Sequence, residues 1–286
     1  MKLVTYNIRY AFGQDERYDL ARVAATVEGA DLIAFQEVER NWRRSGMADQ
    51  PAELARLLPG YYWAYGPAFD VDASHSNGDG SIHNRRRQFG TMLLSKAPIR
   101  ATRLFVLPKL HSRCDFNMTT GALEGVVELA GRPIRIYSLH LSSLSSADRL
   151  IQLDALLALH RQAAGEGGAW TGEHSARSHD WACGEAPPPM PEEAILLGDF
   201  NCEPDSAEYR KLTSNGASLV DAWAAAGEEP EDGITWSPYP GARPNREMRL
   251  DYCFLSSPLE SVVRKSWVDR GACGSDHYPL WIELDL

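Results

Sequence analysis

The sequence predicts a layered α/β protein, because short apolar runs typical of β-strands alternate with a few amphipathic helical stretches. The chain has 286 residues, of which 44% are hydrophobic and 24% are charged, so it is long enough to bury a substantial core. No break in composition divides it, and we therefore expect a single domain over residues 1–286.

The expected elements follow from the position of the apolar runs. Strands are expected at Leu3–Tyr6, Leu32–Phe35, Tyr61–Tyr65, Thr91–Ser95, Arg103–Leu107, Ala122–Leu129, Ile134–Leu139, Ile195–Leu197, Tyr252–Leu255 and Leu280–Leu284. Helices are expected at Leu20–Glu28, Ala52–Leu58, Ala147–Arg161 and Ala207–Thr213. The third helix begins with a capping-box pattern, Ser145-x-x-Asp148, and carries an apolar stripe.

Two segments are expected to be loops. Asp70–Gln88 is polar and ends in Arg85-Arg86-Arg87. The segment at about 165–193 is rich in glycine, proline and charge, which predicts a flexible surface insertion. His174, His179 and Cys183 lie within it, but their spacing matches no zinc motif, so no metal site is assigned to them.

Charge and cysteine content limit the classes of function. The net charge is −10, which disfavours a protein that grips long stretches of duplex nucleic acid. The five cysteines form no C-x-x-C pair, which indicates reduced thiols and no structural zinc. Neither a signal peptide nor an apolar run of membrane-spanning length is evident, so a cytoplasmic protein is expected, and its oligomeric state stays open.

Polar side chains stand at the ends of the apolar runs. Asn7, Glu37 and Asp199 each follow an expected strand directly or within one residue, and Asn201 comes two residues after Asp199. His140 closes another strand, Asp251 opens one, and Asp276-His277 leads into the last. Because strand ends hold side chains on a rigid backbone, several that converge would form a preorganised polar pocket.

These residue types suit one chemistry. Glu37, Asp199 and Asp276 are hard oxygen donors of the kind that Mg²⁺ takes, together with water and substrate phosphate. Asn7 and Asn201 can orient a carboxylate, a water or a phosphate oxygen, and His140 and His277 can donate to an anion or move a proton. A single strand end of this kind usually only caps a turn, so the prediction depends on their combination.

The ordered motifs that contain these residues resemble the endonuclease/exonuclease/phosphatase (DNase I-like) superfamily, and in particular its bacterial metal-dependent hydrolase branch. They are T-Y-N-I, D-L-I-A-F-Q-E-V, Y-S-L-H-L, L-L-G-D-F-N-C-E-P-D-S, R-L-D-Y-C-F-L-S and S-D-H-Y-P-L, with Asp49-Gln50 before a helix as in that branch. The resemblance implies an α/β four-layer sandwich, in which two packed mixed β-sheets are flanked by helices.

The resemblance also implies a role for each matched residue. Glu37 would be the principal ligand of Mg²⁺ or Mn²⁺, with Asn7 and Asp276 close to the ion. Asp199 would orient or deprotonate the attacking water, and Asn201 would hold a phosphate oxygen. Asp251 would pair with His277, and His140 would contact the phosphate or the leaving group. The implied reaction is in-line attack of water on a phosphoester, with one ion or two.

The chain departs from the family pattern at two positions. Gly90-Thr91-Met92 stands where the branch often has G-N-A, and Thr120-Gly121 stands where an arginine commonly precedes the strand. Both positions are expected in the wall of the substrate pocket, so they leave the metal site intact and change the substrate contacts.

Three substrate hypotheses remain. The acidic balance favours a hydrolase of a small or lipid-type phosphoester, a diester or a monoester. A DNA or RNA nuclease is the alternative, with a local groove formed by Arg43-Arg44, Arg85-Arg86-Arg87 and Arg113 and with Trp236 and Tyr239 stacking on bases. Of these residues, Arg87, Arg113 and Trp236 are the candidate substrate contacts. The third hypothesis is a non-catalytic binding module on the same fold.

Overall fold

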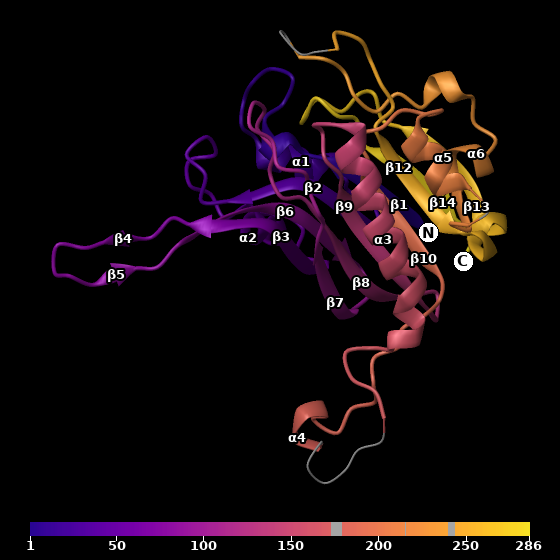
Figure 1. Ribbon diagram of the computed structural model, residues 1–286, viewed down its shortest axis with the longest axis horizontal. Helices are drawn as coiled ribbons and strands as arrows, with labels where there is room; N and C mark the ends of the chain where they lie inside the picture. Colours follow the sequence, from indigo (N-terminus) through magenta and orange to yellow (C-terminus); the bar gives the residue numbers. More distant parts are fainter. Residues whose placement is uncertain (173–178, 215, 240–243) are drawn as a thin grey trace.

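The computed structural model describes residues 1–172, 179–214, 216–239 and 244–286. Two six-stranded mixed β-sheets pack against each other, and helices lie on their outer sides (Figure 1). The N-terminus and the C-terminus lie close together at one end of the sheets (Figure 1). The α/β four-layer sandwich expected from the sequence is confirmed.

The first sheet has the strand order β13-β14-β1-β2-β6-β3. Its central strands β1 and β2 are parallel, and the other neighbours are antiparallel. The bounds are β13 (Val263–Val268), β14 (Leu280–Leu284), β1 (Lys2–Asn7), β2 (Leu32–Arg40), β6 (Arg86–Ser95) and β3 (Tyr62–Asp72).

The second sheet repeats this arrangement, with the order β11-β12-β10-β9-β8-β7 and a central parallel pair, β9 and β10. The bounds are β11 (Leu219–Asp221), β12 (Asp251–Ser256), β10 (Ala194–Asp199), β9 (Arg132–His140), β8 (Gly121–Leu129) and β7 (Ile99–Val106). Parallel neighbours end at the same edge of a sheet, so each sheet brings two strand ends to one edge.

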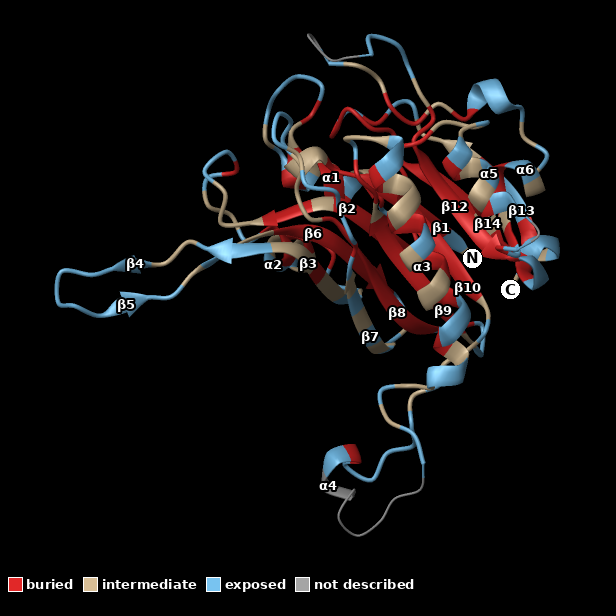
Figure 2. Cartoon of the chain, in the orientation of Figure 1, coloured by how far each residue is buried: buried red, intermediate tan, exposed pale blue. Residues whose placement is uncertain are grey.

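Side-chain alternation along the strands separates the layers. Leu3 belongs to the core between the sheets, whereas its neighbour Val4 faces outward and lies in one cluster with Val23 of α1 (Leu20–Thr26) and Leu54 of α2 (Gln50–Leu57). On the second sheet, Tyr137 faces outward and packs in one cluster with residues of α3 (Ser146–Glu166) and α5 (Ala207–Thr213). Strands buried on both faces explain the continuous apolar runs in the sequence (Figure 2).

The remaining helices are short. They are α4 (His179–Ala182), α6 (Ala222–Ala225) and the 3₁₀ turns η1 (Arg9–Ala11), η2 (Pro230–Asp232) and η3 (Ser257–Val262). The N-cap of α3 predicted at Ser145 is confirmed, since its hydroxyl accepts a hydrogen bond from the backbone N–H of Asp148 at 3.1 Å and donates to Asp148 Oδ2 at 2.7 Å. Among the described residues, no helix combines the length and the apolar character that a membrane span requires.

Both segments predicted as loops contain regular structure. The prediction for Asp70–Gln88 is wrong, because β3 runs to Asp72, β6 starts at Arg86, and β4 (His75–Ser76) pairs with β5 (Ile82–His83) between them. This hairpin projects from the body and is exposed (Figure 2), so neither of its faces carries an apolar period that a sequence reading could detect. In the 165–193 segment, α3 extends to Glu166 and α4 forms, while His174 lies outside the described residues.

A buried charged network lies on the outer face of the second sheet. Arg135 of β9 is almost fully buried and lies 3.6 Å from Glu124, and it donates to the hydroxyl of Tyr137 at 2.7 Å. Its Nη2 also lies 3.3 Å from Nδ1 of His160 on α3. Burial, together with the charges of Arg135 and Arg161, lowers the pKa of His160 to about 4. His160 is therefore neutral in the folded protein at neutral pH.

This pKa shift predicts a loss of stability in mild acid. The unfolded chain takes up the His160 proton below its ordinary pKa of about 6.5, whereas the folded chain takes it up only near 4, so stability falls between these values. We expect this histidine to remove about 2 kcal/mol from the free energy of unfolding between pH 7 and pH 5. Urea unfolding of wild type and His160→Gln at both pH values tests this. An unchanged pH slope in the variant would contradict the assignment.

Candidate active site

Three polar side chains stand side by side at one edge of the second sheet. His140 ends β9, Asp199 ends β10 and Asp251 starts β12, and the register pairs Asp199 with both of the others. The first sheet brings the end of β1 to the same place, where Asn7 donates from Nδ2 to Oδ2 of Asp199 at 2.9 Å. The two sheets are thus joined at the site by a buried hydrogen bond.

A β-bulge directs Glu37 into the site. Between Phe35 and Val38 the pairing of β2 with β6 shifts by one residue, and Glu37 has a left-handed backbone with φ of 60°. A bulge of this kind turns a side chain out of the alternation of its strand. Glu37 Oε1 accepts a hydrogen bond from Asn7 Nδ2 at 3.1 Å, so the Asn7 amide contacts the carboxylates of both Glu37 and Asp199.

The imidazole of His277 lies between two carboxylates. Its Nδ1 is 2.8 Å from Asp251 Oδ2, and its Nε2 is 3.7 Å from Asp199 Oδ2. Burial alone lowers the pKa of His277, but the charges of Asp251 and Asp199 outweigh it and raise the pKa to about 10. Burial and the charge of Asp251 raise the pKa of Asp199. His277 is therefore an imidazolium at neutral pH, with Nδ1 donating to Asp251 and Nε2 directed at Asp199.

Asp276 is held by neighbouring groups. Trp236 Nε1 donates to Asp276 Oδ2 at 3.0 Å, and Arg9 Nε lies 3.9 Å from the same oxygen. Trp236 also forms isolated antiparallel bridges with Met248 and His277, which connect the segments before β12 and before β14. Trp236 is therefore a support for the carboxylate as well as part of the cavity wall.

The segment Gly198-Asp199-Phe200-Asn201 requires its residue types. A Cβ at Gly198 would lie 2.0 Å from the carbonyl oxygen of Leu139, so only glycine allows β10 to approach β9 here. Phe200 is buried in the outer core. Asn201 has φ of 50°, donates its backbone N–H to Asp199 Oδ1 at 2.9 Å and uses Nδ2 to bind the carbonyl of Leu141 at 3.0 Å.

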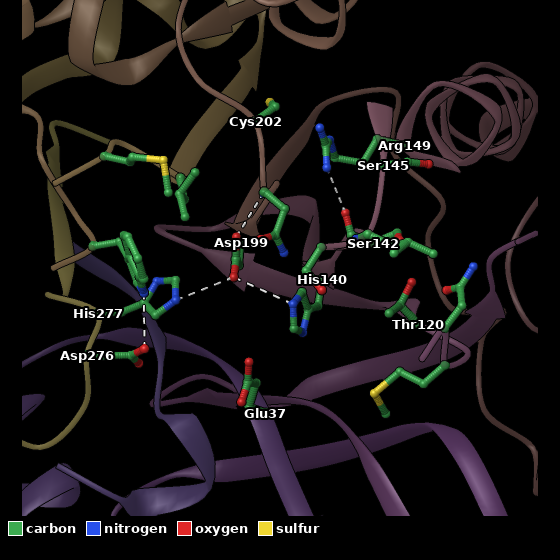
Figure 3. Close-up of a pocket in the computed structure, with 18 of the residues that line it drawn as sticks. Glu37, Thr120, His140, Ser142, Ser145, Arg149, Asp199, Cys202, Asp276 and His277 are labelled. Atoms are coloured by element: carbon green, nitrogen blue, oxygen red, sulfur yellow. Dashed lines mark hydrogen bonds and ion pairs between the residues drawn. The ribbon is translucent and has the colours of Figure 1, made fainter. Parts of the chain in front are cut away.

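One cavity of about 1070 Å³ is lined by Glu37, His140, Asp199, Asn201, Trp236, Asp276 and His277 (Figure 3), whereas Asn7 and Asp251 are not among its lining residues. Figure 3 shows Glu37, His140, Asp199, Asp276 and His277 turned toward a common space. The rest of its wall includes hydroxyl-bearing residues before β8 and around the start of α3, and an aromatic and cationic group from η1, from the segment after β2 and from β6. The hydroxyl-bearing residues include Thr120, Ser142 and Ser145, and the aromatic and cationic group comprises Tyr10, Trp42, Phe89 and Arg44.

The predicted substrate contacts separate into two groups. Trp236 lines the cavity, as does Thr120 of the departure Thr120-Gly121. Among the described residues, those lining the cavity do not include Arg113 or Arg87. Arg113 is exposed on the loop before β8, and the Arg87 guanidinium lies 5.7 Å from the ring of Trp42. Of the arginines predicted to form a basic groove, Arg44 therefore lines the cavity, whereas Arg87 and Arg113 do not.

The sequence reading missed part of the wall. Tyr10, Trp42 and Phe89 line the cavity, but the sequence pattern does not predict them as part of the site. The available signal is the run Trp42-Arg43-Arg44, which only Asn41 separates from the end of β2. The Arg44 guanidinium lies over the Tyr10 ring because the turn η1 places Tyr10 there, and no sequence pattern predicts this turn.

Two packed mixed sheets with helices outside define a protein of the DNase I-like fold. A sequence model of the Endonuclease/Exonuclease/phosphatase family matches residues 4–277, so the chain belongs to this family, which contains hydrolytic phosphoesterases. The superfamily predicted from the motifs is confirmed.

Solved structures of similar fold come from several organisms, and all cover 100% of this chain. An endonuclease/exonuclease/phosphatase from Beutenbergia cavernae is 22% identical to this chain and has a TM-score of 0.69; the match covers 71% of that protein's chain. The mannosyl-6-phosphatase of Bacteroides thetaiotaomicron is 18% identical with a TM-score of 0.64 over its full length. TDP2 of D. rerio, complexed with a single-strand DNA product, is 16% identical with a TM-score of 0.62 over 99% of its chain. No curated protein matches the sequence.

Proposed function

We propose that the protein hydrolyses a phosphoester of a small substrate by water attack at this site, with Mg²⁺ or Mn²⁺ as cofactor. The observation that supports this proposal is the chain of contacts from Asp251 through His277 and Asp199 to Asn7 and Glu37, of which His277, Asp199 and Glu37 line one cavity. Phosphoryl transfer is catalysed mainly by positioning and by charge stabilisation, and such a site offers both.

The donor set fits a hard divalent cation. Glu37, Asp199 and Asp276 line one cavity, and Asp251 lies behind them with its Oδ1 buried and without a hydrogen-bond partner. Among the described residues, Arg9 and the His277 imidazolium are paired with these carboxylates, and two positive charges do not balance four negative ones; Arg44 and Arg149, which also line the cavity, are paired with Glu39 and Glu208. Glu37, Asn7 and Asp276 would hold the ion, which when bound would neutralise charge on the phosphate.

Asp199, Asp251 and His277 also form a compact cluster of possible metal ligands, whose donor atoms lie within 4.8 Å of one another. An ion bound at His277 would first have to displace the proton of a ring whose pKa is about 10, and Nδ1 of that ring is already bonded to Asp251. We therefore assign this cluster to proton and charge chemistry, and the ion to the side of Glu37.

Each remaining residue then has a defined task. Asp199 would accept the proton of the attacking water, and Asp251 would hold the His277 ring so that its Nε2–H stabilises the phosphate oxygens. His140, whose Nε2 lies 3.5 Å from Asp199, would contact the phosphate or the leaving group, and Asn201 would bind a phosphate oxygen with its side chain.

Hydrolysis of bis-p-nitrophenyl phosphate and p-nitrophenyl phosphate tests the reaction class. We expect turnover with Mg²⁺ or Mn²⁺ and a fall of about a hundred-fold or more in EDTA, restored by excess metal. The same test is extended to phospholipids, RNA oligomers and plasmid DNA. If none of these substrates and neither ester is hydrolysed with any divalent metal, the proposal is contradicted and a binding module is favoured. Activity that persists unchanged in EDTA would contradict the cofactor.

A further inference from the structure

The Asp49-Gln50 pair that stands out in the sequence has no task in the reaction described above. Asp49 caps α2, since its side chain accepts the backbone N–H of Ala52 at 3.2 Å. Gln50 is the first residue of α2 and is fully buried. Within the described part of the chain, the cavity wall does not include Gln50. Any effect of this side chain on the reaction must therefore pass through its neighbours.

The amide of Gln50 joins two separate segments of the backbone. Its Oε1 accepts the N–H of Glu39 at 2.9 Å, and its Nε2 donates to the carbonyl of Tyr10 at 2.9 Å. Glu39 lies two residues after Glu37 on β2. Tyr10 lies three residues after Asn7, in the turn η1. One buried side chain thus connects the segment that carries Glu37 with the segment that carries Asn7.

The first of these bonds fixes β2 just beyond its bulge. β1 pairs with β2 only as far as Gln36, so from Glu37 onward β2 has lost that neighbour. The N–H of Glu39 is buried there, and a buried N–H requires an acceptor, which Gln50 supplies. The pairing of β2 with β6 shifts around Glu37. The bond to Gln50 therefore holds the chain immediately after the irregularity that turns Glu37 into the cavity.

The second bond fixes a turn with an unfavourable backbone. The three residues of η1 have φ between 43° and 68°, in the left-handed region that residues other than glycine avoid. Such a turn persists only where surrounding contacts hold it, and the bond from Gln50 to the Tyr10 carbonyl is one of them. In this turn the N–H of Arg9 donates to Asn7 Oδ1 at 3.0 Å. That bond orients the amide whose Nδ2 contacts two carboxylates of the site.

We propose that Gln50 is a positioning residue for the metal site, because it joins the backbones behind Asn7 and Glu37 and so fixes these two side chains relative to each other. This inference rests on the proposed function, in which Asn7 and Glu37 hold the cation. Mg²⁺ demands near-ideal octahedral geometry. Ligands that outer hydrogen bonds keep in place bind a metal more tightly than ligands that move.

A second buried glutamine provides a matched comparison. Gln152 of α3 is also fully buried, and its Oε1 accepts the backbone N–H of Ser142 at 2.8 Å. Its Nε2 donates to the hydroxyl of Thr120 at 3.1 Å. Gln152 therefore has the same burial and the same two kinds of bond, but it joins segments on the hydroxyl-bearing side of the cavity.

Isothermal titration of Mn²⁺ into the metal-free full chain measures the proposed role without substrate. Gln50→Met keeps the length of the side chain and removes both bonds, and we expect it to raise the Kd for Mn²⁺ by at least about ten-fold. With saturating Mg²⁺, kcat for bis-p-nitrophenyl phosphate should fall by about ten-fold while KM stays within about two-fold. Gln152→Met should lower the melting temperature by a similar amount and keep the wild-type Kd for Mn²⁺.

A second variant covers the case in which Gln50→Met does not fold. Gln50→Asn keeps the amide but is one methylene shorter, so it cannot bond to both partners at once, and it should weaken Mn²⁺ binding several-fold. Melting temperatures show which variants are folded. Wild-type affinity for Mn²⁺ in every folded Gln50 variant, or an equal loss in Gln152→Met, would overturn the proposal. The bonds of Gln50 would then only stabilise the fold.

The two proposals fail in different ways. If Gln50→Met weakens Mn²⁺ binding but the wild type hydrolyses no phosphoester, the positioning role stands and the proposed reaction does not. If the wild type hydrolyses model esters with metal but the Gln50 variants bind Mn²⁺ normally, the reaction stands and the positioning role does not. If the wild type binds no Mn²⁺, the cofactor and the positioning role are both wrong.

Discussion

Replacing Asp199 by asparagine is expected to lower kcat by about a thousand-fold with little change in KM. Asparagine has nearly the same shape, and the edge of β10 that carries it is fixed by pairing with both β9 and β12. The variant keeps an oxygen to accept the hydrogen bond from Asn7, but it cannot take a proton from water. The loss would therefore report the chemistry of this side chain rather than its packing.

The measurement is steady-state turnover of bis-p-nitrophenyl phosphate at saturating Mg²⁺, together with the melting temperature in EDTA. We expect the melting temperature to stay within about 5 °C of wild type, because one buried polar group replaces another. Asp72→Asn, on the exposed hairpin, is the matched control and should keep normal kcat. An Asp199→Asn variant with near-normal turnover would remove the role assigned to this residue.

The sequence predicts that Asn7, His140, Asp199 and Asp251 lie together, because each of them closes or opens a buried strand. Asn7 and Asp199 are 192 positions apart, yet they are in contact because β1 and β10 end at the same edge of the two packed sheets. A run of apolar residues fixes the strand, and the first polar residue after it must lie at the edge. The same logic explains why His140 and Asp251 fall into register with Asp199.

The features that the sequence does not predict depend on local backbone geometry. Glu37 enters the cavity through a bulge, and a reading based on strict alternation would end β2 at Phe35, although the strand continues to Arg40. Arg9, Tyr10 and Ala11 all have positive φ although none of them is glycine. The residue types therefore do not predict the turn that places Tyr10 in the cavity wall.

Replacing Glu37 by glutamine is the second change with a large expected effect. Glutamine keeps the oxygen that accepts a hydrogen bond from Asn7, so the link to Asp199 should survive. It removes the negative charge, which is the property that a hard cation requires of its main ligand. We expect turnover to fall by about a thousand-fold and the Mg²⁺ concentration for half-maximal activity to rise by at least about ten-fold.

Thermal unfolding with and without Mn²⁺ separates metal binding from catalysis. An ion that binds only the folded chain should raise the wild-type melting temperature by about 5 °C at about a hundred times its Kd. Glu37→Gln should lose most of this rise. Asp276→Asn should lose less, because Trp236 and Arg9 already compensate that carboxylate. If Glu37→Gln gained the full rise while Asp199→Asn lost it, the ion would belong to the Asp199, Asp251 and His277 cluster instead, and Glu37 would serve only to hold Asn7.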